Sequence, residues 1–179
     1  MALADYIPAE NRSPGLTASE LERAQEAAGA AFPPDLAEFL MDCLPVGGGF
    51  PEWRNDPAGA MHEWQDEMVK GWVFDVEHGY WLEEWGARPD DSREAGARMS
   101  EILHDAPRLI PIYIHRGIPN EPLEAGNPVF SVYGTDTIIF GKDLEEYLLN
   151  EFVRRPVYDP QPRDSFREIR FWSPWAFFE

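Results

Sequence analysis

His62 begins the stretch of this chain that comes nearest to a metal-binding motif, His-Glu-Trp-Gln-Asp. A zinc-protease helix needs a second histidine four residues after the first, because both imidazoles must reach the metal from one face. Asp66 stands at that position, and none of the four histidines has another histidine close to it in the sequence. The stretch therefore predicts a solvated helix face, and we expect neither a metal ion nor a cofactor.

Cys43 is the only cysteine of the chain and the only candidate for a thiol nucleophile. Catalysis would require His104 or His115 to approach it. Cys43 lies on the apolar stripe of its own predicted helix, where a buried thiol is inert. A single cysteine cannot form an internal disulfide, which is typical of a reducing compartment. We predict a structural Cys43 and a cytoplasmic protein.

Adjacent carboxylates are abundant, for example at Glu83–Glu84, Asp90–Asp91 and Glu145–Glu146. Glycoside hydrolysis uses two carboxylates about 5–10 Å apart across a cleft. Among 33 acidic residues, however, neighbouring pairs arise by chance. These pairs indicate solvated helix or turn faces, and we expect no catalytic residue and no enzymatic activity.

His115 and Arg116 follow an apolar run and leave two interpretations open. Such a pair at the end of a strand could bind an anion or a carboxylate of a ligand. It could equally fasten the following loop, residues 117–126, to acidic side chains of the same chain. We favour the second interpretation.

The net charge of −18 is the strongest compositional feature, with 15 basic against 33 acidic residues. A surface of that sign repels nucleic acid and anionic membranes and attracts basic proteins. The same charge is also typical of proteins that use acidic surfaces for solubility. The composition excludes nucleic-acid and membrane partners, and it leaves open whether the acidic surface serves binding or solubility.

The densest strand signals lie between residues 107 and 152. Apolar, β-branched and aromatic runs over 109–114, 129–133 and 137–140 predict three strands, the last two joined as a hairpin. Asp143 then predicts the N-cap of a helix, with Glu146 three residues later.

Cap signals elsewhere predict further helices. We expect helices that begin after Thr17, at Pro34, after Asp56 and within Asp90–Asp91–Ser92. The helix that begins after Asp56 is expected to stop at Gly71. A strand over 72–76 and its hairpin partner over 80–82 are expected to follow it. Residues 1–15 are expected to form a loosely held arm, and residues 16–179 a single α+β domain with a mostly antiparallel sheet.

The tryptophans divide into two predicted groups. Trp64, Trp72 and Trp172 are expected in the core, whereas Trp53 and Trp85 lie among charged and turn residues and could anchor an interface. The predicted partner-binding surface combines these two tryptophans with neighbouring carboxylates: Trp53, Glu63, Asp66, Glu67, Glu77, Glu83, Glu84 and Trp85.

The chain resembles the SUKH superfamily, the Smi/Knr-like proteins, over residues 16–175. Five stretches carry the likeness in the family's order: LTASELERAQEAAGAAFPPDLAEFL, GWVFDVEHGYWLEEWGARP, LIPIYIHRGIP, EAGNPVFSVYGTDTIIFGKDLEEYL and FWSPW. The resemblance implies an α+β fold and architectural roles for several aromatic, proline and glycine positions: Phe74, Trp81, Pro111, Gly126, Pro128 and Phe130.

The resemblance also implies a function without catalysis. Bacterial members are regarded as immunity proteins that bind and block a cognate toxin, often a nuclease, and fungal relatives act as regulatory scaffolds in cell-wall signalling. We therefore expect a protein partner, a basic toxin domain, with a regulatory scaffold as the alternative. The oligomeric state stays open.

Overall fold

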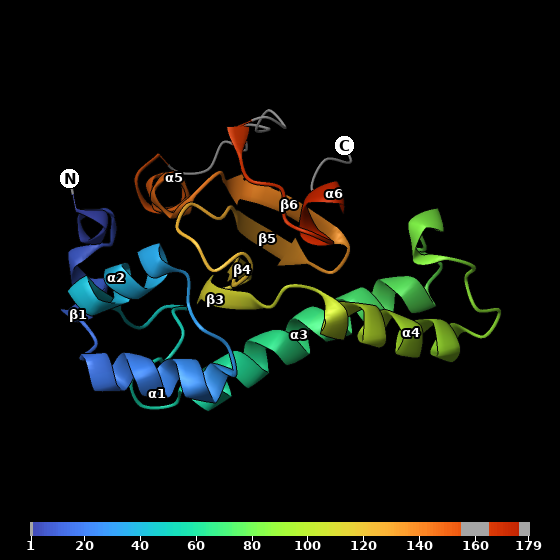
Figure 1. Ribbon diagram of the computed structural model, residues 1–179, viewed down its shortest axis with the longest axis horizontal. Helices are drawn as coiled ribbons and strands as arrows, with labels where there is room; N and C mark the ends of the chain where they lie inside the picture. Colours follow the sequence, from blue (N-terminus) through green and yellow to red (C-terminus); the bar gives the residue numbers. More distant parts are fainter. Residues whose placement is uncertain (1, 155–164, 176–179) are drawn as a thin grey trace.

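The computed structural model describes residues 2–154 and 165–175, and its centre is a four-stranded antiparallel sheet (Figure 1). The strands follow one another in chain order: β3 (Leu109–Tyr113), β4 (Arg116–Pro119), β5 (Val129–Tyr133) and β6 (Asp136–Gly141). The three predicted strands are confirmed. β4, however, was not predicted, because Arg, Gly and Pro are poor strand formers and only pairing with both neighbours fixes them there.

Successive residues of the strands point into two different cores. In β3, Ile110 and Ile112 join one core and Leu109 joins the other. In β5, Phe130 and Val132 lie in this second core. The alternation follows from the two-residue period of a strand, and it places the sheet between two buried layers. The chain is therefore a single α+β domain, as predicted.

The first layer contains the N-terminal helices, whose ends follow the predicted signals. α1 (Ala18–Ala28) begins with a capping box between Thr17 and Glu20 and ends at Gly29, which has a left-handed φ of 62°. α2 (Pro34–Asp42) begins with proline at its first position. α5 (Leu144–Leu149) closes this layer, and Asp143 caps it as predicted by accepting a hydrogen bond from the backbone of Glu146.

The second layer contains α3 (Pro57–Glu77) and α4 (Ser92–Asp105), which pack side by side (Figure 1). Asp56 caps α3, as predicted, and α4 begins within the predicted stretch Asp90–Ser92, with Asp91 as its cap. α3 does not stop at Gly71, and the predicted strand over 72–76 with its hairpin partner is wrong. Trp72 and Val76 are four residues apart and fully buried, so their burial in the second core favours helix over the strand propensity of their types.

Residues 2–15 are packed against the first layer and are not the loose arm that we expected. Tyr6 and Ile7 are buried in its core. Short 3-10 helices at Leu3–Tyr6 and Ala9–Asn11 lead into β1 (Arg12–Pro14), which pairs with β2 (Cys43–Pro45) in a two-stranded antiparallel sheet. Burial of these side chains stabilises a segment whose polar sequence gives little local signal.

The last elements of the described chain complete the two layers. A π-helical turn at Asn150–Arg154 follows α5, and α6 (Trp172–Trp175) packs against β6. Ile169 and Trp172 are buried in the second core, and Trp172 donates from Nε1 to the carbonyl of Pro107. The burial of Trp172 confirms its predicted position in the core. Residues 176–179 lie outside the described part of the chain.

Candidate functional site

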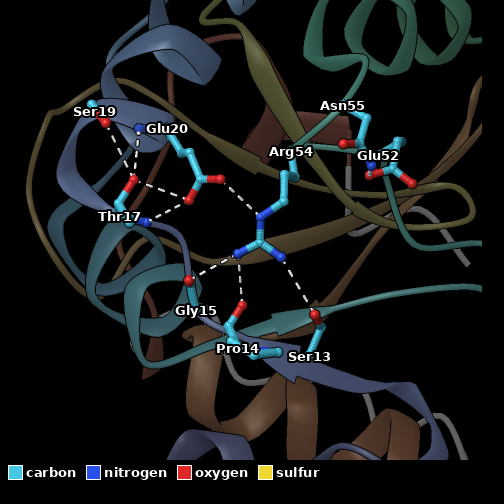
Figure 2. A network of polar contacts seen from close by, with 9 residues as sticks. All are labelled: Ser13, Pro14, Gly15, Thr17, Ser19, Glu20, Glu52, Arg54 and Asn55. Atoms are coloured by element: carbon cyan, nitrogen blue, oxygen red, sulfur yellow. Dashed lines mark hydrogen bonds and ion pairs between the residues drawn. The ribbon is translucent and has the colours of Figure 1, made fainter.

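The segment 46–56, between β2 and α3, is held at both ends by long-range contacts. Arg54 donates from Nε to the carboxylate of Glu20 at 3.0 Å and from Nη2 to the carbonyl oxygens of Pro14 and Gly15 (Figure 2). At the other end, the ring of Phe50 packs on that of Tyr113 with centroids 4.7 Å apart. The segment is therefore a fixed wall beside α3.

Trp64 connects α3 to the sheet by a hydrogen bond. Its Nε1 donates a hydrogen bond of 2.8 Å to the carbonyl oxygen of Ile114, in the turn between β3 and β4. About two helical turns further on, Gly71 lies against the turn between β5 and β6, and a Cβ at Gly71 would come within 3.1 Å of the backbone of Gly134. Glycine at position 71 thus permits close contact between helix and hairpin, whereas we had predicted it as a helix terminator.

Ile114 has a backbone conformation that a β-branched residue rarely adopts, with φ at 46°. Hydrogen bonds on both sides hold it there: its N–H donates to Gly49 at 2.9 Å, and its carbonyl accepts from Trp64. Despite this support, the side chain of Ile114 is 54% exposed. A strained residue that presents an apolar side chain to solvent indicates a functional position rather than a packing position.

These elements enclose a groove of about 980 Å³, which we call the α3 groove. One side consists of residues of α3 between Ala60 and Asp75; the other consists of segment 49–52, Ile114 and His115, and residues 132–134. Three of its side chains are large, apolar and mostly exposed: Tyr133 (77%), Phe74 (59%) and Ile114 (54%). An apolar cluster of this kind, surrounded by polar residues, is typical of an interaction surface.

The rim of the α3 groove is acidic. Five carboxylates line it: Glu52, Asp56, Glu63, Glu67 and Asp75. They face one lysine, Lys70, which is paired with Asp66 at 2.7 Å and with Glu67 at 3.1 Å. The hydrogen bond from Lys70 lowers the pKa of Asp66 below its usual value. The groove therefore presents negative charge around an apolar floor.

His115 lines the α3 groove, but Arg116 points into the protein. Arg116 donates from Nε to Glu151 at 3.0 Å and from Nη1 to Ser131 at 2.7 Å, and its guanidinium stacks over the ring of Phe140. It also contacts the ring of His115. Burial, together with the charge of Arg116, lowers the pKa of His115 and so favours the neutral imidazole. Arg116 binds an acid of its own chain, as in the interpretation that we favoured, although residues 117–119 belong to β4 rather than to a loop.

The predicted partner-binding residues do not form one surface. Glu63 and Glu67 lie on the α3 groove, and Asp66 lies beside them in the ion pair with Lys70. Trp53 is 2% exposed and packs edge-on against Phe32 in the first core, so its predicted exposure is wrong. The charged neighbours of Trp53 in the sequence gave no sign of this long-range contact.

The remaining predicted residues lie beyond the end of the groove. Glu77, in the last turn of α3, faces α4, where its carboxylate lies against Gly96. Glu83, Glu84 and Trp85 form a 3-10 turn, with the two glutamates exposed and Trp85 partly buried against Trp72. About 21 Å of helix separates Glu63 from Glu77 at 1.5 Å per residue, and Glu77 faces α4 rather than the groove.

The candidate chemical groups of the sequence have structural roles here. Asp91 caps α4 and Glu145 accepts a hydrogen bond from Tyr6. Cys43 is buried, as predicted, but it lies in β2 rather than on the predicted helix, and burial raises the pKa of its thiol. In residues 2–154 and 165–175, no group of three or more His, Cys, Asp and Glu side chains is placed to bind a metal ion.

Sequence reasoning missed the apolar part of the α3 groove. Phe74 was expected to be architectural, from the family resemblance, but it is exposed; the expected positions Pro111, Pro128 and Phe130 are buried. Tyr133 and Ile114 were counted as strand residues. Tyr133 and Ile114 are each the last residue of a predicted strand, directly before a turn. At such positions a side chain can be exposed instead of packing on the sheet.

Comparison of the chain with models of protein families, with curated proteins and with solved structures finds no significant match. None of the helices in the described residues has the length and apolar character needed to cross a bilayer.

Proposed function

We propose that this chain is a non-enzymatic binding protein that neutralises a basic toxin domain, such as a nuclease, by covering its working surface. The proposal combines the resemblance to the SUKH superfamily with the α3 groove and the net charge of −18. A nuclease must present basic groups to hold phosphates, and an acidic protein can occupy that same surface. Opposite charges then steer the two proteins together and raise the association rate.

A single observation supports this function most directly: the exposed apolar side chains and the acidic rim belong to one groove. Apolar contacts supply the affinity of a protein interface, whereas charges supply rate and specificity. The α3 groove offers both within one surface. Glu52, Asp56, Glu63 and Glu67 are exposed there, whereas a catalytic general acid is usually buried.

The test uses the basic protein domain encoded next to this chain's gene. The purified chain is mixed with that domain, and complex formation and the domain's toxic activity are both measured. We expect a one-to-one complex and loss of activity when the chain is equimolar. An unrelated protein of similar size and net charge is the matched control, since it separates a specific surface from charge alone.

Two results would contradict the proposal. If the unrelated acidic protein inhibits equally well, the surface of this chain has no specific role. If the chain binds several unrelated regulatory proteins and does not inhibit the domain, a signalling scaffold explains the groove better.

A further inference from the structure

The two ends of the α3 groove differ in chemistry. At the end nearest the start of α3, the lining includes four exposed carboxylates: Glu52, Asp56, Glu63 and Glu67. At the other end, the lining includes Met68, Phe74 and Tyr133, and Ile114 stands between the ends beside Trp64. The groove is thus acidic along one half and apolar along the other.

The carboxylates of the groove differ in how far their own chain already occupies them. Asp75, at the apolar end, accepts two hydrogen bonds from Thr135, at 2.7 Å from its backbone N–H and at 3.0 Å from its hydroxyl. In the acidic half, Glu67 pairs with Lys70, Asp56 caps α3 and Glu52 accepts a hydrogen bond from Asn55. Glu63, by contrast, has no hydrogen bond or ion pair with any described residue. A cationic ligand would therefore meet Glu63 as its free partner, within the acidic half.

The length of the groove fits a short extended segment. From Ala60 to Asp75, α3 is about 22 Å long at 1.5 Å per residue. An extended chain rises about 3.3 Å per residue, so six or seven residues span the groove.

We infer that the α3 groove binds an extended segment of a protein partner, six or seven residues long, with large apolar side chains at one end and Lys or Arg at the other. The apolar end packs against Phe74, Tyr133 and Ile114, and the basic end pairs with Glu63 and its neighbours. This inference rests on the proposed function for the kind of partner, and it adds the form of the segment that the partner presents.

Three synthetic peptides of seven residues test the inference directly. All contain two leucines, two serines and three arginines. The first has leucines at its N-terminus and arginines at its C-terminus, the second has the reverse order, and the third alternates them. We expect one of the two block peptides to bind at least about ten times more tightly than the alternating peptide, by calorimetry at about 100 mM salt, where screening acts over roughly 10 Å.

Variants of exposed residues show where on the surface the peptide binds. The double variant Phe74→Ser/Tyr133→Ser removes exposed side chains and so leaves the cores intact; it is expected to weaken the better block peptide about tenfold. Leu123→Ser is the matched control, because Leu123 is 53% exposed and lies outside the groove lining. It should leave the affinity unchanged.

Ile114→Asn separates binding from folding. Asn tolerates a left-handed backbone better than a β-branched residue, so the melting temperature should rise by about 2 °C while peptide affinity falls at least threefold. A fall in both quantities would mean that Ile114 is a packing residue and would remove it from the site.

Equal binding of all three peptides would overturn the inference, because charge alone would then explain binding. Binding that Phe74→Ser/Tyr133→Ser does not weaken would overturn it as well. These results differ from failure of the proposed function. If the toxin domain is neutralised but the groove variants have no effect, only the inference fails; if the block peptide binds but no toxin is neutralised, only the proposed function fails.

Discussion

Two helices of this protein carry a pair of exposed glutamates spaced four residues apart, and only one pair borders an apolar surface. On α3, Glu63 and Glu67 stand over the floor of the α3 groove. On α1, Glu22 and Glu26 border a shallow surface made of polar side chains of the same helix, among them Ser19 and Arg23. The two pairs have the same charge and spacing but different surroundings.

The difference teaches that negative charge alone does not define a binding surface in a chain of this composition. Carboxylates are spread over both helices, so charge gives little contrast between them. Large exposed hydrophobic residues are the rarer feature, and three of the six in the described part of the chain lie in the α3 groove. Four predictions test this comparison, beginning with the largest expected effect.

Among the four changes, truncation of Trp64 should lower the stability of the fold around the α3 groove most. Trp64→Ala removes a large ring from between helix and sheet and its hydrogen bond to Ile114. We expect a loss of about 3 kcal/mol in the free energy of unfolding, at the low end for tryptophan because the ring is only partly buried. Urea denaturation measures it. Trp64→Phe is the control that keeps a ring, and it should cost about 1 kcal/mol. Equal losses in both variants would show that the ring itself contributes nothing.

Charge reversal compares the two helices directly. Glu63→Lys/Glu67→Lys should slow association with a basic partner about tenfold at low salt, which corresponds to about 1.4 kcal/mol. Glu22→Lys/Glu26→Lys changes the net charge by the same amount and should slow association less than about twofold, if position rather than total charge matters. Stopped-flow mixing at several salt concentrations measures both. Equal slowing by the two variants would remove the α3 groove from consideration.

Arg54 joins the two regions. Its guanidinium binds Glu20 of α1 (Figure 2), and its backbone lies in the segment 46–56, whose residues 49–52 line the groove. Arg54→Met keeps the apolar part of the side chain and removes the ion pair and the hydrogen bonds. We expect a loss of about 1 kcal/mol in stability, measured by urea denaturation. Partner affinity should change less than threefold. A larger fall in affinity would show that the two regions are coupled through the segment 46–56.

The smallest expected effect concerns Glu20 in α1 and the pH dependence of folding stability. The backbone N–H of Thr17, then its hydroxyl, and to a smaller degree Arg54 lower the pKa of Glu20, against the opposing effect of burial. Since the pKa is lower in the folded than in the unfolded chain, the resulting stability is complete above about pH 4.3, the unfolded value, and disappears as the pH falls through the folded value.

Glu20→Gln should therefore reduce the fall in melting temperature between pH 7 and pH 3. The matched variant on α3 is Asp66→Asn, because its hydrogen bond from Lys70 lowers the pKa of Asp66 in the same way. Thermal scans across this pH range measure both variants. A pH profile of Glu20→Gln identical to that of the unmodified chain would contradict this role for Glu20.

The predictions from sequence succeeded where a structure depends on neighbours within about four residues. The caps at Thr17, Asp56, Asp91 and Asp143 are hydrogen bonds to the next helical turn, so residue type and spacing are sufficient. The hairpin of β5 and β6 followed from two apolar runs around a short turn. Strand runs joined by short loops likewise implied the antiparallel sheet.

The predictions failed where distant residues compete with local preference. Residues 72–76 have strand-forming types, yet Trp72 and Val76 gain burial only as a continuation of α3. Trp53 has charged neighbours, yet its ring packs on Phe32, twenty-one residues earlier. For the site, Glu63 and Glu67 were identified from their charge, but Phe74, Ile114 and Tyr133 were not, because exposure cannot be read from residue type.

From its sequence alone, this protein is an acidic α+β domain with capped helices and an antiparallel hairpin, because those features depend on composition and on contacts between near neighbours. Only the tertiary structure decided that α3 continues past Gly71, that Trp53 is buried, and that three apolar side chains remain exposed beside an acidic rim. The physical reason is that burial depends on the whole set of packed elements: α3 reaches the hairpin through Gly71 and Gly134, and this contact creates the groove.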